Sequence, residues 1–382
     1  MKPSPLRAAL ELHAPSDARE AAPRFRFFVL SCRDPQTDFR APLANALRDR
    51  GHEVYYVRFE GRKFAVESGR SRPTESFGLW QLIGSMRRLT QDGVPAVYFN
   101  TTNLRHPILT VVLKFCVGRG IWCFDMHDDL LYDYRGMRRV VAQMRQAVLL
   151  LSSDVVISAA VMLRELFPHS IRLGNASSVR LLKRSAADFG KILIISSLDE
   201  RFDFDLLGEA ADLCPGQRFD LYGQVARDAA KSRLDALCQA HPNIAYKGPY
   251  VAADLENILR RYVVTFAPYR MNSRHTRYLD PLRYYHCLNS GMEVISTDIP
   301  QAHMLADAIH IVGSAREFAD VLARLRLRTE ARKNSGASYT LRGWEERAEQ
   351  LVAILALTPK ARALRSRQEP SGESGFEPRR IL

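Results

Sequence analysis

The sequence has little of what marks a secreted, membrane-spanning or zinc-binding protein. Its six cysteines form no CxxC pair and have no metal-ligand spacing, and most lie in or beside apolar segments, as free thiols do in a reducing compartment. The first residues lack an apolar core, which predicts no signal peptide. The most apolar runs, His106–Phe124 and Ala147–Val161, are interrupted by Lys114, Arg119 and Asp154. Neither supplies the roughly 18 uninterrupted apolar residues of a membrane helix.

Acidic residues are scarce relative to basic ones. The chain has 42 Asp and Glu against 55 Lys and Arg, a formal net charge of +13. Such an excess favours anionic partners: nucleotide phosphates, nucleic acid or an anionic membrane face. Because no aromatic-plus-basic RNA motif, zinc-finger spacing or recognition helix accompanies the charge, we expect no nucleic-acid partner. Scattered solubilising charge also accounts for part of the excess.

The length and the alternation of strands and helices predict an α/β protein of two domains. At 382 residues the chain exceeds one ordinary domain, and 46% hydrophobic residues suffice for two cores. A strand-loop-helix-strand opening near residue 25 restarts near residue 191, which indicates two doubly wound halves with ligands at strand carboxyl ends. The expected limits are a disordered N-terminus at 1–22, a first domain at 23–185, a second at 186–340, a helix packing back at 341–357 and a disordered basic tail at 358–382.

The most informative stretch is Tyr278–Thr297, YLDPLRYYHCLNSGMEVIST. Asp280 is expected to be the N-cap and Pro281 the first residue of a helix that leads, through a glycine turn, into a buried strand. A helix beginning at a strand's carboxyl end offers free N–H groups and a positive dipole end to an anion. Arg283 and His286 lie three apart on one face of it. The alternative is an ordinary helix whose Arg and His are surface residues.

Five motifs in order resemble a known family. PLRYYHCLNSGMEVIST is similar to the "PLK…EYLA-x-G-x-PVV" segment of GT-B glycosyltransferases that build bacterial surface polysaccharides, and SSLDERFDFDLL to their "GALDERFD-x-DLL". NIAYKGPY resembles the loop beside the nucleotide base, CFDMHDDLLYD their "YD-x-x-DD" segment, and LLSSDVVISAAVMLRELFP their "aD-x-V-x-x-S" strand and helix. The opening VLSCRDPQTDFR parallels "VLSAHDFR" of xanthan-type glucuronosyltransferases. The likeness covers roughly residues 25–356.

The resemblance implies a GT-B fold, with two Rossmann-like domains and the nucleotide-sugar in the second. It implies these donor-binding residues: Arg283, His286, Tyr250, Ser196, Arg274 and Pro281. The chain departs from the family pattern at four of its positions. Arg283 replaces a lysine and gains bidentate phosphate geometry, His286 replaces the ribose-binding glutamate, and Ser196 or Ser197 replaces a glycine. Glu293, in place of a proline, has no evident chemical role.

Asp128 is our candidate general base. A transfer that inverts the anomeric centre needs a carboxylate or histidine within reach of the attacking hydroxyl, and Asp128 follows a predicted first-half strand. His127 and Asp129 are alternatives, and Asp128 and Asp129 are also placed to cap the next helix. Asp34 and Arg33, after the first strand, are candidates for the acceptor side or are plain loop residues.

The loop before the helix carries Arg270, Asn272, Arg274 and Thr276 as candidates for diphosphate contacts, against the alternative of solvated loop charge. No DxD-type metal dyad lies on the nucleotide side. The resemblance therefore implies departure of the leaving group without a metal and no cofactor besides the nucleotide-sugar substrate.

These features predict a cytoplasmic glycosyltransferase, of hexosyl- or glucuronosyltransferase type, peripheral to the inner membrane face. It would move a sugar from a UDP-sugar to a glycan or lipid-linked acceptor in exopolysaccharide synthesis. A non-catalytic GT-B-like protein that binds nucleotide or glycan is the main alternative. A periplasmic-type binding protein would need a signal sequence, and a phosphorylase a cofactor lysine site, which the sequence does not show; an epimerase of similar architecture stays open.

Overall fold

The computed structural model describes residues 24–35, 38, 40–61, 63–69, 75–102, 104–182, 190–331 and 343–365. The predicted N-terminal segment, 1–22, and residues 366–382 of the predicted tail lie outside these ranges. The chain divides into two compact units, each described by itself below. Unit 1 comprises residues 1–125, 140–156 and 348–382, and unit 2 comprises residues 126–139 and 157–347. Each unit therefore takes its residues from separate stretches of the chain.

Within the described residues, the first sheet has eight strands in the order β4-β3-β2-β1-β5-β6-β7-β8. The central pairings β2–β1, β1–β5 and β5–β6 are parallel, whereas β3 and β4 add an antiparallel edge. Its strands are β1 (Arg26–Ser31), β2 (Glu53–Glu60), β3 (Lys63–Glu67), β4 (Glu75–Phe77), β5 (Ala96–Asn100), β6 (Ile121–Met126), β7 (Val155–Ser158) and β8 (Ile171–Arg172).

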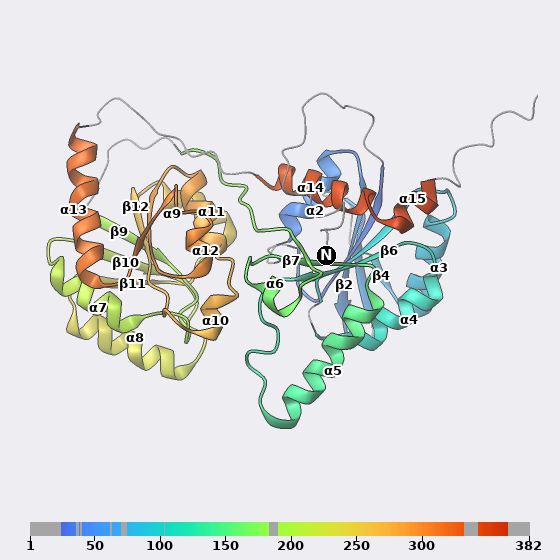
Figure 1. Ribbon diagram of the computed structural model, residues 1–382, viewed down its shortest axis with the longest axis horizontal. Helices are drawn as coiled ribbons and strands as arrows, with labels where there is room; N and C mark the ends of the chain where they lie inside the picture. Colours follow the sequence, from blue (N-terminus) through green and yellow to red (C-terminus); the bar gives the residue numbers. More distant parts are fainter. Residues whose placement is uncertain are drawn as a thin grey trace, which may run out of the picture. The chain divides into compact units, whose positions relative to one another are not determined.

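Helices join these strands and cover both faces of the sheet (Figure 1). They are α2 (Ala41–Asp49), α3 (Leu79–Leu89), α4 (Pro107–Val117), α5 (Gly136–Ser152), α6 (Leu163–Leu166), α14 (Trp344–Ala356) and α15 (Pro359–Arg365). Right-handed crossovers place α3, α4 and α5 on one face and α2 on the other. The sequence predicts disorder from residue 358, but α15 continues the chain in helix, with Ala361 buried and Lys360 Nζ 2.9 Å from Asp154 Oδ2.

A buried ion pair joins the first helix of unit 1 to its sheet. Arg40 donates from Nε to Asp125 Oδ2 at 2.7 Å and from Nη2 to Oδ1 at 3.0 Å, and both side chains are 0% exposed. Asp125 lies in β6, and the Arg40 N–H donates to Asp38 Oδ1 at 2.9 Å. Asp38 in turn accepts hydrogen bonds from the hydroxyls of Ser31 and Tyr56. This polar network ties β2 to the carboxyl ends of β1 and β6.

The sheet of unit 2 has six strands among the described residues, in the order β11-β10-β9-β12-β13-β14, with every pairing parallel. Its strands are β9 (Lys191–Ile195), β10 (Arg218–Tyr222), β11 (Ile244–Gly248), β12 (Val264–Ala267), β13 (Glu293–Thr297) and β14 (Ile309–Val312). Its helices are α7 (Phe204–Leu213), α8 (Asp228–Ala240), the 3₁₀ turn η1 (Ala252–Asp254), α9 (Leu255–Leu259), α10 (Arg274–Arg277), α11 (Leu282–Asn289), α12 (Pro300–His303) and α13 (Ala315–Ala331).

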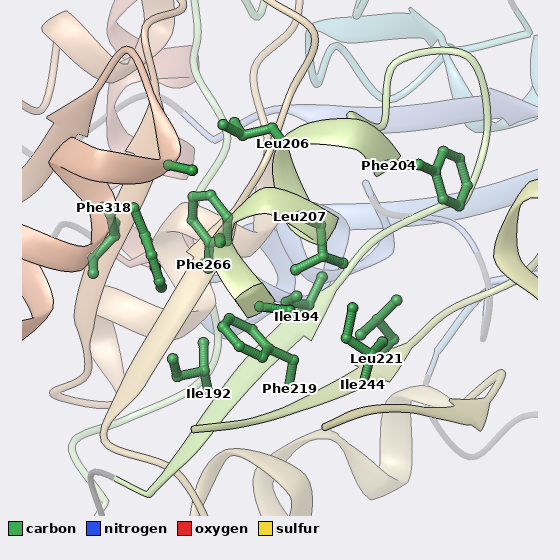
Figure 2. Close-up of a cluster of buried hydrophobic side chains, with 14 of the residues drawn as sticks. Ile192, Ile194, Phe204, Leu206, Leu207, Phe219, Leu221, Ile244, Phe266 and Phe318 are labelled. Atoms are coloured by element: carbon green, nitrogen blue, oxygen red, sulfur yellow. The ribbon is translucent and has the colours of Figure 1, made fainter. Parts of the chain in front are cut away.

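An apolar core on one face of this sheet holds unit 2 together. Figure 2 shows Ile192, Ile194, Phe219 and Phe266, from three adjacent strands, against Leu207 of α7. Each is almost fully buried, so each contributes about 1.5–3 kcal/mol relative to an exposed side chain. The strands read as continuous apolar runs because helices cover both of their faces. The core fixes the strand carboxyl ends, from which the candidate site is built.

Candidate nucleotide-sugar site

The centre of the candidate site is Arg283, in the first turn of α11. Its Nη2 donates to Ser196 Oγ at 2.8 Å, and its guanidinium carbon lies 4.7 Å from the centre of the Tyr269 ring. Ser196 directly follows β9, and Tyr269 follows β12 two residues after its end. Two neighbouring strand ends therefore hold the arginine at the start of a helix, where N–H groups and the helix dipole also favour an anion.

The α11 N-terminus differs from its prediction in one detail. Pro281, rather than Asp280, is the N-cap, and no side chain caps the first turn. Asp280 instead accepts hydrogen bonds from the Asn175 N–H at 2.8 Å and the Tyr285 hydroxyl at 2.9 Å. Because these partners occupy its carboxylate, Asp280 anchors the helix to the segment around residue 175. The first N–H groups of α11 are left without a side-chain cap.

Close backbone approach at the end of β9 depends on a glycine that the sequence analysis did not single out. Gly223, at the end of β10, has φ +148°, and a Cβ there would lie 1.7 Å from the Ser196 carbonyl oxygen. Any side chain at this position would push the two strand ends apart. Ser196, predicted as a departure from a family glycine, thus has its own glycine partner on the adjacent strand.

His286 lies one turn beyond Arg283 on α11. One of its ring nitrogens, Nδ1, is 2.6 Å from Ser177 Oγ, which also accepts the Val179 N–H at 3.0 Å. Desolvation lowers the pKa of His286 to about 4, so the ring is neutral at ordinary pH. A neutral imidazole has one hydrogen-bonding atom besides Nδ1, which suits a hydroxyl but not the charge of a phosphate.

A second arginine, Arg201, lies on the same side of unit 2. It forms a bidentate pair with Asp199, and the Arg270 N–H donates to its carbonyl at 2.8 Å. Burial opposes its charge, but the Asp199 carboxylate outweighs burial and raises the pKa of Arg201. The charge of Asp128 adds to that rise and also helps to raise the pKa of the buried Tyr269. The charge of Asp128 therefore acts on both residues.

The segment after β6 reaches the loop around α10. Asp129 Oδ2 accepts from Arg274 Nε at 2.7 Å, and its Oδ1 accepts the Leu131 N–H at 3.1 Å. The rings of Tyr132 and His275 lie 4.0 Å apart. These contacts lie within unit 2, so Asp128 and Asp129 belong to the same compact unit as Arg283. Both oxygens of Asp129 accept hydrogen bonds within the protein, which counts against Asp129 as the base.

The remaining predicted residues of unit 2 are Tyr250, Thr276, Asn272 and His127. Tyr250 is half-buried after β11; burial raises the pKa of its hydroxyl and the charge of Arg283 lowers it, so the two side chains are neighbours. The Thr276 hydroxyl donates to the carbonyls of Arg270 and Ser273, and Asn272 has a positive φ of 57°. His127 is half-buried beside Asp128.

Asp34 and Arg33 belong to unit 1. Arg58 pairs with Asp34 there, and the Arg33 N–H donates to Ser31 Oγ at 3.1 Å. The sequence analysis assigned no role to Asp199, Arg201 or Tyr269. Asp199 and Arg201 lie inside the motif SSLDERFD, and the arginine of that motif was the signal that could have indicated them.

Comparison with solved structures identifies the architecture. Sucrose-phosphate synthase from Thermosynechococcus elongatus matches 90% of this chain and 99% of its own, with a TM-score of 0.59 at 14% identity. AviGT4, a glycosyltransferase of avilamycin A biosynthesis, matches 89% of this chain and 98% of its own, with a TM-score of 0.56 at 14% identity. The chain has the GT-B fold.

The predicted fold class is thereby confirmed. A third GT-B match, HepE from Anabaena, crystallised with UDP and glucose, covers 91% of this chain and all of its own, with a TM-score of 0.52 at 12% identity. No family model and no curated protein matches the sequence. At these identities the GT-B likeness establishes the fold alone, and the chemistry has to be argued from the site.

Proposed function

We propose that the chain is a glycosyltransferase that moves a sugar from a UDP-sugar to a glycan or lipid-linked acceptor in cell-surface polysaccharide synthesis. The observation that carries the proposal is Arg283, held by Ser196 and Tyr269 at the N-terminus of α11 in a GT-B fold. A planar guanidinium beside free helix N–H groups suits a diphosphate. HepE, with the same fold, was crystallised with UDP and glucose, which supports a sugar nucleotide as the ligand.

The proposed chemistry follows from the charges of the site. Asp128 accepts the proton of an acceptor hydroxyl, whose oxygen attacks the anomeric carbon of the sugar. The bond between that carbon and the phosphate oxygen breaks, and UDP leaves with the electron pair. Arg283 and the α11 N-terminus stabilise the negative charge that develops on the leaving group. Transfer by inversion, and a hexosyl or glucuronosyl donor, are parts of this proposal.

His286 favours a second candidate function, nucleotide binding without transfer. In the resemblance its position belongs to a ribose-binding glutamate, and a neutral histidine lacks that carboxylate. Its remaining ring nitrogen still offers one hydrogen bond to a ribose hydroxyl. A protein that binds UDP but shows no transfer with any donor and acceptor would fit this second function.

Replacing Arg283 by alanine is expected to weaken UDP binding by about 10- to 100-fold, because a charge-assisted hydrogen bond contributes about 1.5–3 kcal/mol. Arg283→Lys should be intermediate, since lysine keeps the charge but loses the bidentate geometry and the stacking on Tyr269. Thermal shift against increasing UDP measures the effect, because a bound ligand stabilises by mass action. Arg316→Ala, an exposed arginine of α13, is the control. Equal UDP affinity of Arg283→Ala and the control would contradict the proposed site.

Transfer is expected to persist in excess EDTA, because Arg283 and the α11 N-terminus stabilise the leaving diphosphate in the proposed chemistry. The measurement is UDP release with and without chelator at a fixed donor concentration. Loss of the activity in EDTA and its recovery with Mg²⁺ or Mn²⁺ would show that a cation shares this role.

A further inference from the structure

Three neighbouring helices of the first sheet form an exposed surface that is both apolar and basic. α3, α4 and α5 are linked side by side: Arg87 of α3 donates to the Cys116 carbonyl of α4, and Lys114 of α4 donates to the Ser152 carbonyl of α5 at 2.6 Å. Figure 1 shows these helices in the right-hand part of the picture. We call their outward side the α3–α5 face.

The long helix α5 contributes most of the exposed large apolar side chains of the α3–α5 face. Only Ala142, Gln146 and Leu149 of its 17 residues are buried. Its outward side carries large apolar side chains instead, at helical spacing: Met137, Val140, Val141, Met144, Val148 and Leu151. At about 100° per residue these six fall within roughly 100° of one another, opposite the buried side. Met144 is 64% and Leu151 87% exposed. The helix thus has a second apolar stripe that no other described element covers.

The neighbouring helices extend the apolar surface. Trp80 at the start of α3 is 75% exposed, and Ile108 and Phe115 of α4 are 77% and 83% exposed. Large exposed aromatic and aliphatic residues gathered on adjacent helices are uncommon on a protein that contacts only water. A binding partner for this face is therefore indicated.

The charge of the same helices identifies the kind of partner. α3, α4 and α5 contain no acidic residue, while Arg88 of α3 and Arg138 and Arg145 of α5 are exposed. Arg138 and Arg145 lie along one side of the α5 stripe, where their long side chains can reach past the apolar groups toward a charged layer. These helices combine apolar and cationic side chains and have no acidic ones. Such a face fits a partner with an anionic outer layer and an apolar layer beneath it.

We propose that the α3–α5 face binds an anionic lipid bilayer, with the α5 stripe at the boundary between headgroups and acyl chains. No helix among the described residues is long and apolar enough to cross a bilayer, so the contact is with one leaflet. The purpose of this binding rests on the proposed function, because a lipid-linked acceptor would be presented at this surface. The binding itself requires no sugar transfer.

Vesicle flotation of the full chain tests the proposal. Wild-type protein should float with vesicles of phosphatidylcholine and phosphatidylglycerol, and much less with phosphatidylcholine alone or at high salt. Met144→Ser/Leu151→Ser should lower the partition coefficient by about tenfold or more, because it removes apolar area from the stripe. Arg138→Gln/Arg145→Gln should lower binding to anionic vesicles and flatten the salt dependence.

The matched control is Leu213→Ser/Leu327→Ser, which removes two exposed leucines of unit 2. It should float like the wild type. Failure of the wild type to float at low salt would overturn the proposal, as would equal flotation of the stripe variant and the control. A wild-type dimer that the stripe variant converts to monomer, without vesicle binding, would assign the face to a second copy of the chain instead.

The result is separable from that of the proposed function. UDP binding, measured by thermal shift without vesicles, reports on the Arg283 site alone. A chain that floats but binds no UDP keeps the membrane surface and rejects the transferase. A chain that binds UDP but does not float rejects the membrane surface.

Discussion

Asp128→Asn is expected to lower kcat/KM for sugar transfer by about 10²- to 10⁴-fold, the usual contribution of a general base. Asparagine keeps the shape of the side chain but does not accept the proton of the attacking hydroxyl. UDP binding should stay close to that of the wild type, because Arg283 and α11 make the proposed diphosphate contacts. Initial rates of UDP release, with thermal shift in UDP alongside, separate the two effects.

The matched control for this change is Asp133→Asn, five residues further along the same segment. Its side chain is 62% exposed, and its pairing with Arg227 at 3.7 Å is weak. Transfer by this variant should equal that of the wild type. Unchanged transfer by Asp128→Asn would remove Asp128 from the proposed chemistry and move attention to His127. A loss of UDP binding in Asp128→Asn would instead point to damage around Arg201.

Asp125→Ala is expected to destabilise unit 1 by about 3–5 kcal/mol, because it leaves the buried guanidinium of Arg40 without its carboxylate. Urea unfolding followed by tryptophan fluorescence measures the loss, since Trp122 is buried in the same strand. The double change Arg40→Met/Asp125→Leu should recover most of it, because two apolar side chains leave no buried charge.

The exposed pair of Arg50 and Glu349 in unit 1 provides a comparison. Their atoms lie 2.6 Å apart, but the side chains are 37% and 55% exposed. Glu349→Ala should therefore cost at most about 1 kcal/mol. Similar costs for Asp125→Ala and Glu349→Ala would show that burial adds nothing to the pair of Arg40 and Asp125.

Much of the fold could be predicted because its strands are apolar runs bounded by polar loops and glycines. The strand expected near residue 25 is β1, which begins at Arg26, and the restart expected near residue 191 is β9, which begins at Lys191. Parallel strands buried on both faces give the clearest pattern in a sequence. The GT-B arrangement, in contrast, came from the resemblance of five motifs rather than from this pattern.

Shorter and more polar elements were missed for physical reasons. β3 and β4 form an antiparallel edge, and β4 has the sequence ESF, too short and polar to show an alternation. α10 is a single turn of four residues with three basic side chains, which resembles a loop. Asp280 looked like an N-cap because it precedes Pro281, but its carboxylate is used by Asn175, 105 residues earlier in the chain.

The candidate site was predictable only where one segment carries it. Arg283 and His286 lie on one helix, so helical spacing alone indicates that they share a face. The pairing of Arg283 with Ser196 joins residues 87 apart, and that of Arg40 with Asp125 joins residues 85 apart. Periodicity carries no information on such partners. The need for glycine at Gly223 likewise depends on a strand that pairs with its own only after folding.

The interleaved composition of the two units has a consequence for biosynthesis. Unit 1 begins at the N-terminus, yet α14 contributes residues to it from Ala348 onward, after all of unit 2. Leu351 and Leu355 of that helix are fully buried. On the ribosome, the first sheet must therefore wait, with apolar surface exposed, until nearly the whole chain has been synthesised. A truncation that removes α14 would therefore destabilise unit 1, whose first strands are the first to be translated.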